Sequence, residues 1–203
     1  MSPRPYRSVA RQAASVETRS RILAAARELL GSESGATGFS LDAVARKAGV
    51  VRMTVYYQFG SKGGLLEALF DDLAVRGDIM RLREVFAAGG APRRTLSEFI
   101  AVIGHFYESS RAVIRRLNAL AALDPDIERA IEARIDRRRD GAREIVRRLV
   151  AVEGPLAVDE TEAVNVLTML TSVETFHALA GGGGFEAVVP LVQRLADASL
   201  GRR

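Results

Sequence analysis

The sequence contains no cysteine, no tryptophan and only two histidines, His105 and His177. The absence of cysteine excludes disulfide bonds, thiolate metal sites and cysteine nucleophiles. Two widely separated histidines are too few for a histidine-rich metal site, and no phosphate-binding loop or Ser/His/Asp arrangement is evident. We therefore expect no metal site, no cofactor and no catalytic residues, which leaves an enzyme working in an apolar cavity as the least favoured function.

Long apolar runs are also missing. The longest uncharged stretches, Ala163–Val173 among them, have 11 residues, whereas a membrane-spanning helix needs about 18. The first ten residues carry arginines but no apolar core, so they do not form a signal peptide. These absences predict a soluble, cytoplasmic protein that does not contact a membrane.

Lysine is scarce, and basic charge is concentrated near the N-terminus. Of the 29 basic residues only Lys47 and Lys62 are lysines. Residues 1–65 hold 10 basic and 4 acidic residues, a balance of +6, whereas residues 66–203 hold 19 and 21, a balance of −2. The asymmetry indicates a polyanionic partner for the N-terminal end. The alternative is a solvated surface rich in arginine.

Apolar residues recur with helical spacing along nearly the whole chain, and no alternating strand pattern is present. Most glycines and prolines lie between the periodic segments. The sequence therefore predicts an all-α fold of about nine helices. We expect them at about 16–30, Leu41–Ala48, Arg52–Gln58, from Lys62 to a break at Gly89–Pro92, over a stripe at Leu96–Tyr107, and at Arg111–Leu123, 125–150, Asp159–Ala180 and Phe185–Leu200.

Residues 39–62, FSLDAVARKAGVVRMTVYYQFGSK, predict two short helices joined by a tight turn. Ser40 is a good N-cap, because its hydroxyl can accept a hydrogen bond from a free amide of the first turn. Gly49 lies where the first helix must end in a left-handed residue. The second helix begins almost at once, so the pair has the spacing of a helix-turn-helix.

The second of these helices has side chains suited to DNA. Arg52 can form two hydrogen bonds with a guanine edge, and Met53 or the Thr54 methyl can contact a thymine methyl. Tyr56 and Tyr57 present hydroxyls, and Lys62 supplies a point charge for a phosphate. The alternative is ordinary amphipathic packing of the tyrosines, but the basic surroundings favour DNA.

The run SLDAVARKAGVVRMTVYYQFGSKGGLLEALF resembles the DNA-binding head of the tetracycline-repressor (TetR) family of bacterial regulators, and the likeness extends over about Glu17–Phe70. It implies a three-helix DNA-binding domain at 16–62 and a ligand-binding and dimerisation domain at 63–203, whereas the prolines and arginines of residues 1–15 predict a basic arm. It also implies a homodimer formed through the last two helices. The DNA-binding residues that it implies are Ser40, Arg52, Met53, Thr54, Tyr56, Tyr57, Gln58 and Lys62.

Three residues depart from the family pattern. Val51 stands where Ser or Thr is common, so the recognition helix lacks a side-chain cap. Gln58 replaces a frequent histidine. Gly63 and Gly64 replace better helix formers, from which we expect a loose joint between head and body.

The C-terminal residues suggest an effector pocket only in outline. Its candidates are aromatic, polar or flexible residues expected on the inner helix faces: Phe86, Phe106, Tyr107, Asn118, Met169, Phe176 and His177. For each of them, packing in the core or exposure on the surface is the competing interpretation. We expect Arg137, Arg138 and Arg139 to form a solvated, charged helix face.

Together these observations predict a ligand-responsive repressor that binds a near-palindromic operator in double-stranded DNA and is released by a small-molecule effector. The effector's identity does not follow from the sequence. A DNA-binding protein without an effector, architectural or constitutive, is the main alternative.

Overall fold

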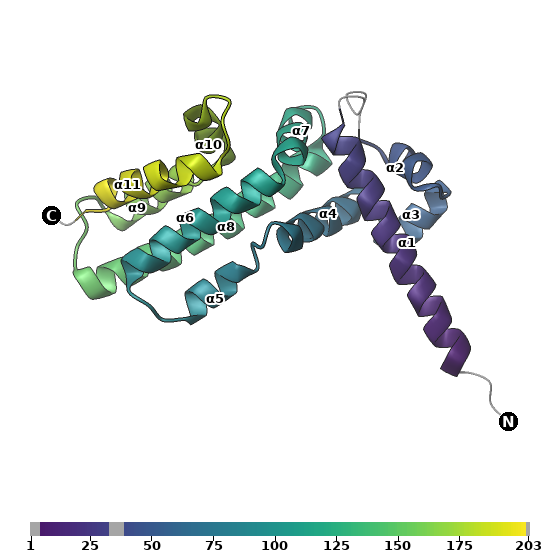
Figure 1. The fold of residues 1–203 in the computed structure, drawn as a ribbon, viewed down its shortest axis with the longest axis horizontal. Helices are drawn as coiled ribbons and strands as arrows, with labels where there is room; N and C mark the ends of the chain where they lie inside the picture. The colour runs from purple at the N-terminus through teal and green to yellow at the C-terminus, as the bar shows by residue number, and fades with distance from the viewer. Residues whose placement is uncertain (1–4, 33–38, 202–203) are drawn as a thin grey trace. The chain divides into compact units, whose positions relative to one another are not determined.

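The computed structural model describes residues 5–32 and 39–201, in which eleven α-helices and no β-strand occur (Figure 1). The helices are α1 (Pro5–Gly31), α2 (Leu41–Ala48), α3 (Arg52–Phe59), α4 (Lys62–Arg76), α5 (Arg81–Ala87), α6 (Pro92–Ser109), α7 (Arg111–Ala121), α8 (Pro125–Glu153), α9 (Glu160–Leu170), α10 (Val173–Ala180) and α11 (Val189–Ser199), with a 3-10 turn, η2, at Glu186–Val188. Over the same residues, no helix is both long enough and apolar enough to span a membrane. The all-α prediction is confirmed.

The predicted number of helices was too low because two expected helices are each divided. The helix expected from Lys62 ends at Arg76, where a Cβ on Gly77 would lie 2.7 Å from Ser109 Oγ and 2.8 Å from Phe106 Cδ2. Gly77 thus permits a close approach to α6. The helix expected over Asp159–Ala180 divides into α9 and α10, because the Ser172 hydroxyl caps α10 by accepting a hydrogen bond from Thr175 N at 3.2 Å.

The N-terminal segment also differs from expectation. Residues 1–15 were predicted as an arm, yet α1 begins at Pro5 and continues without a break to Gly31. The apolar pattern begins only near Ile22, so periodicity alone missed the first part of this helix. Residues 1–4 of the predicted arm lie outside the described part of the chain.

The chain packs as two compact units. The first comprises residues 1–72 and 112–130, and the second comprises residues 73–111 and 131–203. Helices α4 and α8 therefore each contribute residues to both units. These units are defined by packing, and a functional boundary after residue 62 stays a prediction.

The second unit has an apolar core formed by α6, the later part of α8, α9, α10 and α11. A Cβ on Gly141 of α8 would lie 2.9 Å from the Phe99 ring of α6, so a glycine here lets these two helices approach closely. Residues from all five elements are at most 1% exposed: Leu96, Phe99, Ile100, Ala142, Ile145, Leu149, Leu167, Phe176, Val192 and Ala196.

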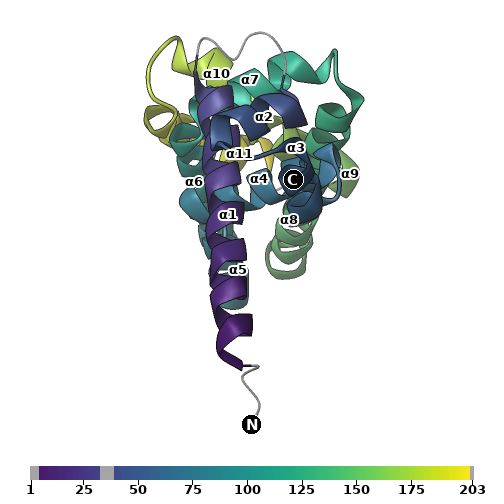
Figure 2. The ribbon, with the colours of Figure 1, turned by 90° about the vertical axis from the view of Figure 1, so that its right-hand side faces the viewer.

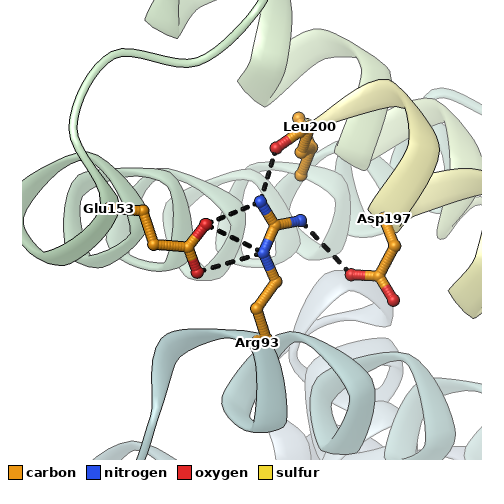
Figure 3. Close-up of polar contacts among 4 residues, drawn as sticks. All are labelled: Arg93, Glu153, Asp197 and Leu200. Atoms are coloured by element: carbon orange, nitrogen blue, oxygen red, sulfur yellow. Dashed lines mark hydrogen bonds and ion pairs between the residues drawn. The ribbon is translucent and has the colours of Figure 1, made fainter. Parts of the chain in front are cut away.

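Arg93, near the start of α6, connects three helix ends of the second unit (Figure 3). Its guanidinium donates to the Glu153 carboxylate at 2.8–3.1 Å, to Asp197 at 3.3 Å and to the Leu200 carbonyl at 2.7 Å. The hydrogen bond to Glu153 is the main reason that the pKa of Arg93 lies above its ordinary value. The ends of α8 and α11 are therefore held to the first turn of α6.

Candidate nucleic-acid interface

In the first unit, α2 and α3 lie beside α1 (Figures 1 and 2). Ile22, Ala26 and Leu30 occupy one face of α1 and are at most 2% exposed. Val44 of α2 and Val55 of α3 are fully buried. Apolar burial on these three helices positions the outer surface of α3.

The turn between α2 and α3 has the predicted chemistry. The Ser40 hydroxyl accepts a hydrogen bond from Ala43 N at 3.2 Å, which confirms the N-cap. Gly49 has φ 65° and ψ 37°, the left-handed conformation that glycine adopts without strain. Val50 N then donates to Ala45 O at 3.0 Å. The turn is therefore closed by local hydrogen bonds, and α3 starts in a fixed direction.

The surface of α3 is unusually exposed for its apolar content. Val55 is its one buried residue, whereas Met53 is 68%, Tyr56 54% and Tyr57 88% exposed. Val51, also exposed, makes no side-chain cap, as its residue type predicts. A monomer gains nothing by exposing such side chains together, so this surface is suited to a partner.

Arg52 and Thr54 complete this surface at the start of α3. Arg52 NH1 lies 3.2 Å from Asp42 Oδ2 of α2, with the two side chains 64% and 50% exposed. An exposed pair of this kind is weak, so it leaves the Arg52 guanidinium available to another acceptor. Thr54 is half-buried, beside the exposed Met53.

Gln58 is held by α1. Its Nε2 donates to Ser15 Oγ at 3.0 Å, and its backbone carbonyl oxygen accepts from Arg19 Nη1 at 2.8 Å. The Arg19 guanidinium also lies 4.3 Å from the centre of the Phe59 ring. Sequence reasoning missed Ser15 and Arg19, because no local pattern shows that α1 passes the end of α3.

Lys62 forms an ion pair with Asp124, which lies between α7 and α8 in the first unit. The side chains are 21% and 22% exposed. Burial raises the pKa of Asp124, but the hydrogen bond and charge of Lys62, with two backbone amides, lower it further than burial raises it. Lys62, predicted to contact a phosphate, therefore already has an acidic partner within the chain.

The glycine pair after α3, predicted to form a loose joint, has different surroundings at its two residues. A Cβ on Gly64 would lie 2.0 Å from Phe59 O, a distance that no side chain tolerates. A Cβ on Gly63 would meet only Ser61 Oγ, at 3.6 Å. Gly64 is therefore required by a close backbone approach, and the junction is tightly packed at that residue.

The predicted pocket residues are only partly brought together. In the second unit, the ring of Tyr107 lies 5.7 Å from that of Phe106 and 5.6 Å from that of Phe176. Phe86 instead packs on Phe99 at 6.0 Å. His177 is exposed, and its ring lies 6.4 Å from that of Phe185, which lies 6.1 Å from that of Phe176. Met169 is 57% exposed, and Asn118 belongs to the first unit.

The chain matches the bacterial regulatory proteins of the tetR family over residues 22–69. No curated protein matches the sequence. The fold, however, resembles those of many solved structures. The regulator PfmR from Thermus thermophilus is 25% identical, with a TM-score of 0.64 over 90% of this chain and 100% of that one.

Two more distant structures share the fold. The repressor NalD of Pseudomonas aeruginosa is 22% identical, with a TM-score of 0.69 over 93% of this chain and 98% of that one. FadR of Bacillus subtilis, solved with stearoyl-CoA, is 17% identical, with a TM-score of 0.67 over 87% of this chain and 96% of that one.

Proposed function

The chain is a tetR-family regulator by its N-terminal segment and its fold, and we propose that it is a dimeric repressor released from its operator by a small-molecule effector. The observation that carries the proposal is the outer surface of α3. Met53, Tyr56 and Tyr57 are exposed there beside Arg52. An arginine at the start of a helix in the major groove is positioned to recognise guanine. The methyl group of Met53 would contact a thymine methyl, and the rings of Tyr56 and Tyr57 would contact thymine or the sugars.

The remaining DNA contacts that we propose are to the phosphates. Ser40, Tyr57, Gln58 and Lys62 would provide them. The Ser40 hydroxyl uses a lone pair to cap α2, so its proton can still be donated to a phosphate oxygen. Such contacts fix the register of α3 on the duplex without reading its sequence.

Two copies of the head would read two half-sites about one helical turn, roughly 34–36 Å, apart. The predicted dimer interface, in the last two expected helices, corresponds to α9, α10 and α11. Met169, Leu179 and Leu195 on these helices are 57%, 39% and 38% exposed. A second copy of the chain would cover such side chains. An effector in the second unit would act by favouring a state whose head spacing no longer fits the operator.

The test is fluorescence anisotropy with the DNA immediately upstream of the protein's own gene and with random duplex, at two salt concentrations. We expect two chains per operator and selective binding. Arg52→Ala should cost about 1–3 kcal/mol on the operator and relax its sequence preference. The matched control is Arg143→Ala, an exposed arginine on α8 that also pairs with one aspartate, Asp140.

Equal loss on operator and random DNA for Arg52→Ala would show that Arg52 does not read bases. Equal binding of wild-type protein to both DNAs would contradict the repressor proposal. It would favour the alternative, a DNA-binding protein without an effector.

A further inference from the structure

The inner face of α8 combines apolar residues with arginine. Ala142, Ile145 and Leu149 are fully buried on this face. Arg138 lies one turn before Ala142 on the same face, where the helical spacing calls for another apolar residue. The sequence predicted a solvated face for Arg137–Arg139, but Arg138 is half-buried and turned toward α6.

The guanidinium of Arg138 is incompletely satisfied. NH1 donates to the Tyr107 hydroxyl at 2.6 Å, which in turn donates to the Thr171 carbonyl at 3.2 Å. Nε is inaccessible to solvent and has no acceptor within the described residues, and the same is true of Nε of Arg139. Within that part of the chain, Arg138 forms no ion pair with a carboxylate.

Tyr107 does not supply the missing negative charge. Burial raises the pKa of Tyr107, and the nearby Arg138 offsets this only in part, so the hydroxyl stays protonated at neutral pH. The charge of Glu174 raises the same pKa, which places a carboxylate in the neighbourhood, but Glu174 is exposed and not bonded to Arg138. Arg138 is thus a half-buried cation whose buried Nε has no acceptor, so an anion beside its guanidinium would be stabilised.

Apolar surface adjoins this cation. The Tyr107 ring packs edge-on against Phe176, and the half-buried Phe106 ring lies 5.7 Å from it. Phe176 is fully buried, so Phe106 is the ring of this group that a ligand can reach. A molecule with an acidic group and an apolar body matches both features. Its acidic group would pair with Arg138, and its apolar body would pack on Phe106.

We infer that the second unit binds an amphipathic anion, with its carboxylate or phosphate on the guanidinium of Arg138 and its apolar body along Phe106. This inference rests on the proposed function, since it names the chemical class of the effector. The carboxylate or phosphate would supply the negative charge that Arg138 lacks among the described residues, and arginine binds both groups through paired hydrogen bonds.

Isothermal titration of the full-length protein tests the inference without DNA. The probes are decanoate, decyl phosphate and decanol, which share a ten-carbon chain and differ in the head group. We expect at least one acid to bind at least tenfold more tightly than decanol. Which acid binds more tightly distinguishes a carboxylate effector from a phosphate effector. No binding of either acid, or equal binding of acids and alcohol, would overturn the inference.

Variants locate the site. Arg138→Met should abolish the preference for acids, whereas Arg143→Met, which removes an exposed arginine from the same helix, should leave it intact. Glu174→Gln should tighten acid binding about threefold, because a like charge is removed. If Arg138→Met does not fold, as judged by circular dichroism, Arg138→Gln and Glu174→Gln carry the test. An acid preference that persists without Arg138 would place the anion elsewhere.

Operator release is measured separately, by anisotropy with the tighter-binding acid. Acid binding that leaves the operator complex intact would retain the site but remove its role as the effector site. Operator binding without any acid binding would retain the DNA-binding function and refute this inference.

Discussion

At the scale of single residues, Lys62 shows how a side chain suited to DNA can also have a partner within the protein. The ion pair with Asp124 is about four-fifths shielded from solvent on both sides. Its charges are therefore screened less by salt than those of a surface pair. A phosphate that binds Lys62 must displace or share this carboxylate, so Asp124 should weaken DNA binding in a way that does not depend on sequence.

We expect Asp124→Asn to increase affinity for operator and random DNA alike, by roughly two- to fivefold per head, the equivalent of about 0.5–1 kcal/mol. The asparagine keeps an oxygen that can accept the hydrogen bond that Asp126 N now donates to Asp124, at 3.2 Å. Anisotropy measures the change, and Lys62→Ala should weaken both complexes.

The double variant is the control, because Asp124→Asn should have no effect once Lys62 is alanine. A gain that persists in the Lys62→Ala background would show that Asp124 acts by general repulsion. Stability gives an independent check. The lowered pKa of Asp124 means that its contribution is present at pH 6 and is lost as the pH falls below the ordinary carboxyl value toward the folded one.

At the scale of helices, the junction of α3 and α4 depends on backbone packing. Gly60 ends α3 with φ 75°, and Gly60 N donates to Tyr56 O at 2.7 Å. Gly64 in the first turn of α4 then passes so close to Phe59 O that a Cβ would overlap it. Packing therefore requires a glycine at residue 64 despite its low helix propensity, whereas it does not require one at residue 63.

We predict that Gly64→Ala destabilises the protein by more than 1 kcal/mol, because relieving a 2.0 Å contact requires the backbone to shift. Gly63→Ala is the matched control. Its Cβ has room, and it should stabilise the helix by up to about 1 kcal/mol. Urea unfolding of both variants measures the difference, and equal stabilisation by the two alanines would contradict the packing argument.

At the scale of the whole molecule, the second unit is closed by contacts between residues far apart in the chain. Arg93 joins Glu153, Asp197 and the Leu200 carbonyl, which lie 60 to 107 residues later. These partners come from the ends of α8 and α11 (Figure 3). No local interaction brings these ends together, so the contacts depend on the packing of the helices that carry them.

Arg93→Met should lower the free energy of unfolding by about 1.5–3 kcal/mol, because Glu153 loses the hydrogen bonds that Arg93 donates. Arg93→Lys should recover little, since an ammonium group cannot reach three partners in the planar arrangement of a guanidinium. Arg94→Met is the control, because among the described residues Arg94 pairs with Glu98 alone, and it is 78% exposed. Full rescue by lysine would show that charge alone matters.

The sequence by itself determined the local features of this protein. The Ser40 cap, the left-handed Gly49 and the apolar faces of the helices follow from residues a few positions apart, because capping, φ preference and helical period are local properties. The same reasoning identified the helix-turn-helix and the outward side chains of α3. It could not predict the contacts between residues that are far apart in the chain.

Tertiary structure decided which of these side chains have partners. Lys62 meets Asp124, Gln58 meets α1, and Arg138 turns inward to Tyr107 instead of outward to solvent. It also divided two expected helices, at Gly77 and at Ser172. These outcomes depend on which surfaces pack together, and packing between segments tens of residues apart is not encoded in any local pattern.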